Sequence, residues 1–154
     1  MVKAFLQNIL RPKLVRMQLQ AATKDDAIRE LVDILDQGGL LKDRAEAERV
    51  VFERERAMST GMENGIAIPH GKTDMVNSLV VSIGLKPKGL DFQAVDGQPS
   101  RILLLTLSPP GSTGPHLRFM AEVSKILRNA DVRAKLLQTQ TPEQLVQLLI
   151  AAAP

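Results

Sequence analysis

The stretch RILLLTLS, residues 101–108, is a nearly continuous apolar run of strand length. Such a run is typical of a central strand covered on both faces, because a strand with one face in water alternates apolar and polar residues. Working outward, SLVVSIGL at 78–85 predicts a second strand, and KLVRMQLQ at 13–20, whose alternation is imperfect, predicts a third. The intervening segment 86–99 is rich in turn residues and is expected to carry a short edge segment.

Helical patterns surround these strands along the chain. The clearest, at 22–39, has Thr23 as an N-cap candidate and ends at a pair of glycines. Further helices are expected at 42–59, within 109–129, at 131–140 and at 141–153, the last capped by Thr141. The residues predicted to face inward are apolar and recur at helical spacing: Ala27, Leu31, Ile34 and Leu35; Ala47, Val50 and Val51; Leu117, Met120, Val123 and Leu127.

These elements predict the fold class. Helices on both sides of a largely buried sheet indicate an α/β protein, a single-domain sandwich spanning residues 1–154 with a central mixed β-sheet flanked by helices on both faces. A chain of 154 residues is near the commonest domain size. Hydrophobic residues make up 44% of it and charged residues 24%, as is ordinary for a soluble globular protein.

Composition excludes several classes of function. The chain has no cysteine, so disulfides, thiolate metal sites and cysteine nucleophiles are excluded, and its two histidines argue against a structural zinc site. The net charge is +3, but basic residues are scattered among acids and there is no Trp or Tyr, which argues against nucleic-acid binding. Charge returns at Arg11, Lys13 and Arg16 after a short apolar start, so the sequence predicts a cytoplasmic protein that is not embedded in a membrane.

One of the two histidines lies in GIAIPHGK, residues 65–72. Pro69 holds the residue before it in extended geometry and fixes its own φ, so the backbone that delivers His70 is expected to be stiff. Gly71 is expected to let the chain turn away after the histidine and to leave room beside the ring. A side chain placed rigidly among bare backbone suits a reactive group that another molecule must reach.

The surrounding residues narrow the chemistry of His70. No GxSxG elbow is present for serine hydrolysis, and no HxxH or HExxH spacing is present for a metal. General-base catalysis stays open, but nucleophilic catalysis by the imidazole itself fits best. A neutral imidazole nitrogen can accept a phosphoryl group and surrender it again. Such a site needs cations or N–H donors for the phosphoryl oxygens and a rim that protein partners can reach.

The segment ERERAMSTGMENGIAIPHGKTDMVNSLV, residues 53–80, resembles the active-site segment of the IIA components of the bacterial phosphoenolpyruvate-dependent phosphotransferase system (PTS). The resemblance is to the fructose/mannitol class, which includes the nitrogen-regulatory IIA proteins. It continues through 89–99 and 115–129, where the second family histidine falls on His116. The residues that match the family pattern in place are Arg54, Ser59, Thr60, Gly61, Asn64, Gly65, Pro69 and His70.

The resemblance implies a single IIA domain of this type over 1–154, acting as a PTS phosphotransferase component with a covalent phosphohistidine and without cofactor or metal. His70 would accept the phosphoryl group from HPr or an HPr-like carrier. Arg54 and His116 would lie near it, and Thr60 and Asn64 would support the site loop. His70 would then pass the group to a cysteine of a IIB domain in sugar uptake, or hold it as a nitrogen-regulatory signal for a target protein.

Three alternatives remain at this point: a sugar-transport component, a regulatory protein-binding module of the nitrogen branch with no role in sugar transport, and a fold relative that has lost phosphotransfer. The absence of an attached IIB or membrane segment favours the second over the first. The presence of His70, Arg54 and His116 argues against the third.

The sequence departs from the family at Glu63, where relatives commonly carry glycine. If that position has positive φ, glutamate there is strained. Its charge is also expected within reach of the phosphoryl group. On this interpretation Glu63→Gly would stabilise the protein or leave it unchanged, and would speed phosphoryl acceptance.

Overall fold

The computed structural model describes residues Met1–Pro154, and its sheet is built on β5 (Ser100–Ser108). On one side β5 pairs antiparallel with β4 (Val80–Leu90), which in turn pairs in parallel with β1 (Val15–Arg16) at the edge. On its other side β5 pairs in parallel with β2 (Ile66–Ala67) and β3 (His70–Lys72). The prediction of a buried central strand within a mixed sheet is therefore confirmed.

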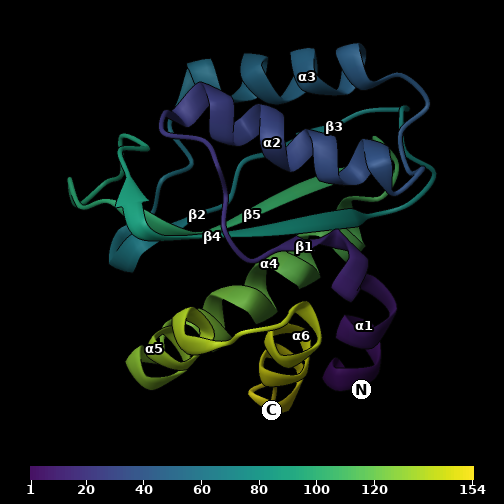
Figure 1. Ribbon diagram of the computed structural model, residues 1–154. Helices are drawn as coiled ribbons and strands as arrows, with labels where there is room; N and C mark the ends of the chain where they lie inside the picture. Colours follow the sequence, from purple (N-terminus) through teal and green to yellow (C-terminus); the bar gives the residue numbers. More distant parts are fainter.

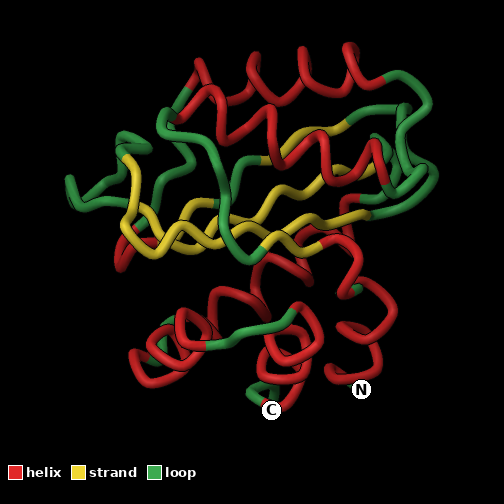
Figure 2. Tube along the Cα trace, in the orientation of Figure 1, coloured by secondary structure: helices red, strands yellow, loops and turns green.

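Helices cover both faces of this sheet (Figures 1 and 2). On one face lie α2 (Lys24–Gln37) and α3 (Arg44–Ala57). On the other lie α1 (Val2–Ile9), α4 (Thr113–Leu127), α5 (Ala130–Gln138) and α6 (Pro142–Ala151), with both chain termini. Thr23 and Thr141 cap α2 and α6 through their side chains, as predicted. The result is the predicted α/β sandwich.

The two faces have separate hydrophobic cores, and β5 contributes to both. Because side chains alternate along a strand, Ile102 and Leu104 pack towards α4 and α6, while Leu103 and Leu105 pack towards α2 and α3. The run that looked uniform in the sequence is thus divided between two layers.

Several local predictions were wrong. The predicted strand 13–20 is reduced to Val15–Arg16, because a 3₁₀ turn at Pro12–Leu14 precedes it and the N–H groups of Gln20 and Ala21 bond to the Glu30 carboxylate. The short edge segment expected within 86–99 is the far end of β4, which runs on to Leu90 through a register irregularity.

Two helical features also differ from expectation. Helix α1 was not predicted; it is eight residues long and buries Leu6 in the core shared with α6. Such a short helix depends on packing more than on its own propensity. In α4, Leu117 is 61% exposed and is not part of the inward stripe, because the helix turns His116 and Phe119 inward instead.

No helix of the structure has the length and apolar character needed to cross a membrane.

Candidate functional site

His70 begins β3 and is held by pairings on both sides of Pro69. Ile66 in β2 lies beside Ile102, and His70 lies beside Thr106. Between these pairs the Pro69 carbonyl accepts the Thr106 N–H at 3.0 Å. A proline fits here because the ladder uses its carbonyl and not the N–H that it lacks. The backbone that delivers the histidine is therefore anchored to the central strand, in agreement with the predicted stiffness.

Gly71 does not turn the chain away, so that part of the prediction was wrong. It continues β3, pairs with Leu107 and has no positive φ. A Cβ atom at this position would lie 2.8 Å from Cγ1 of Val50 on α3. The missing side chain lets α3 lie close against β3, and this close approach brings side chains of α3 to His70.

The His70 imidazole has a defined protonation pattern. Its Nδ1 lies 2.9 Å from the carbonyl oxygen of Ile68. A carbonyl oxygen can only accept, so Nδ1 carries the hydrogen and donates it. In the neutral ring the lone pair is then on Nε2.

His116 faces His70 from the first turns of α4. The ring centroids are 5.4 Å apart and the rings are inclined at 42°. His116 is buried and its Nδ1 has no hydrogen-bond partner. Burial, followed by the nearby His70 and Lys72, lowers the pKa of His116. Both effects disfavour protonation of the second ring, and its buried Nδ1 lacks a partner within the protein.

Both histidines and Arg54 line one cavity of about 710 Å³, here called the His70 cavity, formed by α3, β3 and α4. Arg54 lies in the last turn of α3, where its Nη1 donates to the Met58 carbonyl at 3.0 Å. The exposed Leu117 lies at the same cavity. The structure thus brings His70 together with Arg54, which lies 16 residues before it in sequence, and with His116, which lies 46 residues after it.

Lys72 is a fourth polar residue of the His70 cavity, and sequence reasoning missed it. Its Nζ donates to Oγ1 of Thr113 on α4 at 3.1 Å. In a strand, residues two apart point to the same face, so a lysine two positions after His70 is placed on the histidine's side. That spacing was the available signal.

Thr60 and Asn64 do not line the His70 cavity. Thr60 is buried, and both its N–H and its hydroxyl donate to the Glu55 carboxylate. Asn64 is exposed, and its N–H donates to Asp96 at 3.1 Å. Any effect of these two residues on His70 is exerted through the shape of the loop.

The strain argument for Glu63 is wrong. The residues of this loop with positive φ are Asn64, at 65°, and Gly65, at 77°. Glu63 begins the 3₁₀ turn with ordinary backbone geometry, is exposed and does not line the His70 cavity. Asn64 therefore takes the left-handed conformation, which asparagine tolerates better than most residues.

Comparison with known proteins gives a consistent result. A family model described as "Phosphoenolpyruvate-dependent sugar phosphotransferase system, EIIA 2" matches residues 8–152. The PTS fructose-specific EIIA component of Haloferax volcanii is 36% identical over 146 residues, which cover 95% of this chain and 94% of that protein. A nitrogen regulatory protein of Klebsiella oxytoca is 31% identical over 153 residues, covering 96% of this chain and 91% of that one. The chain spans 23% of the fructose-specific EIIABC component of Bacillus subtilis, with 28% identity over 144 residues.

Solved structures agree with these matches. Nitrogen regulatory protein IIA-Ntr from Neisseria meningitidis has a TM-score of 0.85 at 25% identity, covering 92% of this chain and 97% of that one. Enzyme IIA-mannitol of Escherichia coli, in its complex with phosphorylated enzyme IIB-mannitol, has a TM-score of 0.79 at 23% identity, covering 92% and 97%. The second likeness establishes a shared fold.

Proposed function

Because the chain belongs to the EIIA 2 family of the phosphoenolpyruvate-dependent sugar phosphotransferase system, we propose that it carries a phosphoryl group on Nε2 of His70. The observation that supports this atom is the hydrogen bond from Nδ1 to the Ile68 carbonyl, which leaves the lone pair of the neutral ring on Nε2. The donor is a phosphohistidine of HPr or of an HPr-like carrier. The residues proposed to assist are Arg54, His116 and Lys72, all of which line the same cavity.

The transfer moves a PO₃⁻ group between two imidazole nitrogens. The Nε2 lone pair of His70 forms the new P–N bond while the P–N bond of the donor breaks, and the donor nitrogen keeps that electron pair. The Nδ1 hydrogen of His70 stays in its bond to Ile68, where it stabilises the positive charge that the phosphorylated ring acquires. Little covalent work is left for the protein, so positioning and charge stabilisation supply most of the rate.

The cations of the His70 cavity suit the charge on the phosphoryl oxygens. Arg54 keeps its charge at any working pH and offers paired donors. Lys72 adds a second positive charge on the same face of β3 as His70. His116, with its lowered pKa, donates a hydrogen bond while neutral and does not repel an incoming cationic donor ring.

Mass spectrometry after incubation with phosphoenolpyruvate, enzyme I and HPr tests the assignment. The protein is expected to gain one acid-labile, base-stable phosphate, and His70→Ala is expected to gain none. His116→Ala keeps His70 and is expected to be labelled more slowly, by about 10- to 1,000-fold. Full labelling of His70→Ala, or a label that survives acid, overturns the proposal.

Two roles are proposed for the phosphoryl group once it is on His70. The fructose-specific relative supports transfer from His70 to a cysteine of a IIB domain in sugar uptake. The nitrogen regulatory relatives support a role in which the phosphorylation state selects a target protein. Mixing the phosphorylated protein with fructose-class and mannitol-class IIB domains separates them. Transfer to the IIB cysteine supports the first role, and a phosphate retained on His70 with every IIB domain supports the second.

A further inference from the structure

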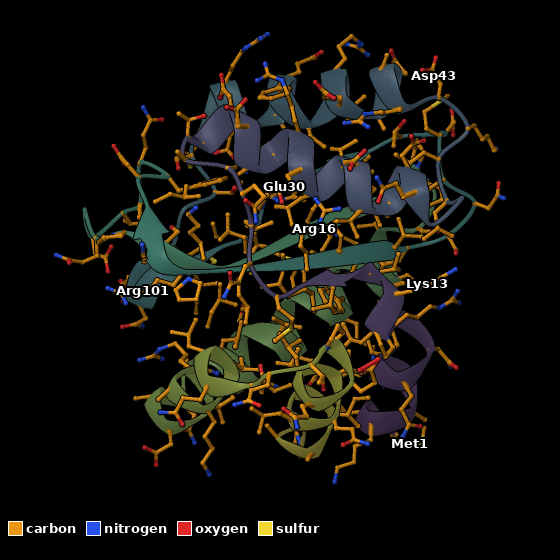
Figure 3. The ribbon with its side chains drawn as sticks, viewed as in Figure 1. Met1, Lys13, Arg16, Glu30, Asp43 and Arg101 are labelled. Atoms are coloured by element: carbon orange, nitrogen blue, oxygen red, sulfur yellow. The ribbon has the colours of Figure 1, made fainter.

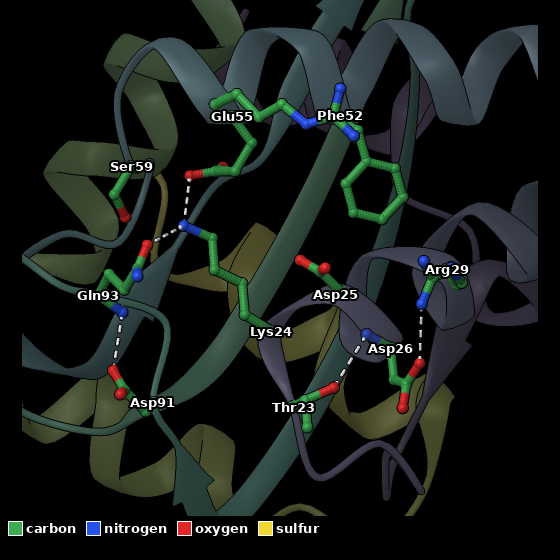
Figure 4. Close-up of a pocket in the computed structure, with 11 residues that line it drawn as sticks. Thr23, Lys24, Asp25, Asp26, Arg29, Phe52, Glu55, Ser59, Asp91 and Gln93 are labelled. Carbon is green, nitrogen blue, oxygen red and sulfur yellow. Dashed lines mark hydrogen bonds and ion pairs between the residues drawn. The ribbon is translucent and has the colours of Figure 1, made fainter.

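Helix α3 separates the His70 cavity from a second cavity of about 740 Å³, here called the Lys24 cavity (Figure 4). Two adjacent residues near the end of α3 line different cavities: Arg54 lines the His70 cavity and Glu55 lines the Lys24 cavity. The Glu55 side chain is only 4% exposed, although it carries a carboxylate. A charge buried to this degree is retained only with several partners.

The partners of Glu55 are a single loop residue and a lysine. Thr60 donates its N–H to Oε2 at 2.6 Å and its hydroxyl to Oε1. Lys24 places Nζ 3.1 Å from Oε2 and also donates to Gln93, as the dashed lines in Figure 4 show. Glu55 thereby ties the end of α3 to Thr60, in the loop that leads to His70.

Thr60 is in turn bonded to the residue that orients the imidazole. The Thr60 carbonyl accepts the Ile68 N–H at 3.1 Å. The Ile68 carbonyl, on the far side of the same residue, accepts the His70 Nδ1–H at 2.9 Å. A bridge between Gly61 and Ala67 continues the same short ladder. A series of hydrogen bonds and one ion pair therefore connects Lys24 to His70 through Glu55, Thr60 and Ile68.

We propose that Glu55, held by Lys24, is a positioning residue for His70, an inference that rests on the proposed function. Strand β2 has only two residues; β5 pairs with one side of it, and the 60–62 segment lies against its other side and supports its register. Glu55 fixes that segment, and the segment fixes the carbonyl that selects the Nδ1–H tautomer. The consequence is that a residue on the opposite side of α3 determines whether Nε2 has a free lone pair.

Glu30 provides a matched control on the other edge of the sheet. Its side chain is 11% exposed, and it also accepts two hydrogen bonds from a loop, from the N–H groups of Gln20 and Ala21. It pairs with Arg16, next to which it lies in Figure 3. The segment that Glu30 holds connects β1 to α2 and does not lead to His70. Loss of either carboxylate leaves two backbone or side-chain donors without a partner.

The test compares Glu55→Ala with Glu30→Ala by ¹⁵N NMR of the imidazoles at about pH 8.5, where a histidine is neutral. Wild-type His70 is expected to be hydrogen-bearing at Nδ1. Glu55→Ala is expected to shift His70 towards the Nε2–H form and to slow phosphoryl acceptance by about 10- to 100-fold, the range for a misplaced reacting group. Glu30→Ala is expected to lose stability to a similar degree while its His70 tautomer and rate stay as in the wild type.

Conservative variants decide between positioning and general destabilisation. Glu55→Gln can still accept the Thr60 N–H and donate to the Thr60 hydroxyl, so it is expected to retain the wild-type tautomer. Thr60→Val removes the hydroxyl bond alone and is expected to give a smaller tautomer shift than Glu55→Ala, whereas Thr60→Ser restores it. Thr60→Val and Thr60→Ser provide the test if Glu55→Ala does not fold.

An unchanged His70 tautomer in Glu55→Ala, or in Thr60→Val where the alanine variant is unfolded, overturns the inference. An equal shift in Glu30→Ala also overturns it. The tautomer is read without any phosphoryl donor, so its result is independent of the labelling of His70→Ala, which tests the proposed function alone.

Discussion

The His70 cavity and the Lys24 cavity lie on opposite sides of α3 and are similar in size, at about 710 and 740 Å³, yet their charges are arranged differently. Two of the three cations that line the Lys24 cavity form ion pairs: Lys24 with Glu55, and Arg29 with Asp26 and Glu48. In the His70 cavity, Arg54 bonds to a backbone carbonyl and Lys72 to a threonine hydroxyl, and neither forms an ion pair.

This difference distinguishes structural charges from available ones. A cation that already has a carboxylate partner gives little to an incoming anion, because the existing pair must first be broken. Arg54 and Lys72 keep donors for an anion that arrives from outside. Arg49, which also lines the His70 cavity, is of the paired kind, because it forms ion pairs with Glu46 and Glu53.

The largest effect is expected from removing one available guanidinium. Arg54→Ala should slow phosphoryl transfer to His70 by about 10- to 1,000-fold, the range for losing one charge-stabilising donor. It should fold normally, because its one bond in the structure is to the exposed end of α3. Rapid-quench transfer from phosphorylated HPr measures the rate, and the melting temperature measures folding.

Arg29→Ala, in the Lys24 cavity, is the matched control. It loses two half-exposed ion pairs, so its transfer rate should stay within about twofold of wild type and its stability should fall by no more than about 1 kcal/mol. Equal slowing in both variants would remove the distinction between the two cavities.

The next effect concerns the contact that keeps α3 beside His70. Gly71→Ala places a methyl group 2.8 Å from Cγ1 of Val50, a β-branched side chain with little freedom to move. Overpacking of this kind costs about 1–3 kcal/mol of unfolding free energy. Urea unfolding of Gly71→Ala, Val50→Ala and the double variant measures it. The double variant should recover about 1 kcal/mol relative to the sum of the two, and strict additivity would show that the two residues are not in contact.

How far the sequence predicted this site depends on which residues are neighbours along the chain. The apolar run 101–108 and the motif around His70 are local patterns, and both led to confirmed features of the fold and family. The packing of Gly71 on Val50 could not be predicted, because it depends on how closely α3 approaches β3. The rotation of α4 about its axis, which exposes Leu117 and buries His116, likewise depends on how the helix packs in the folded protein.

A third prediction uses the lowered pKa of His116, which follows from burial and from the neighbouring His70 and Lys72. The unfolded chain binds a proton at this residue more readily than the folded protein, so stability rises with pH in this window. As the pH falls through about 6.5, the ordinary value for histidine, the wild type should lose stability that His116→Gln does not lose. Urea unfolding at a pH above and a pH below that value checks the sign. A difference between the two proteins that is independent of pH would contradict it.

The smallest effect is expected at Glu63, a carboxylate that lines neither cavity. Its backbone geometry is ordinary, so Glu63→Gly relieves no strain and instead gives the unfolded chain more freedom, at a cost of about 0.5–1 kcal/mol. Asn64 has a φ of 65°, a conformation that glycine adopts without strain. In Asn64→Gly this relief of strain in the folded state should offset the greater freedom of the unfolded chain, so the variant should be close to neutral in stability. Urea unfolding of the two variants side by side distinguishes the two positions. The rate of phosphoryl transfer to His70 should stay within about twofold of wild type in both variants, because neither change alters the cations of the His70 cavity. A stabilised Glu63→Gly would restore the interpretation that a glycine is preferred there, and faster transfer would show that the Glu63 charge reaches the phosphoryl group.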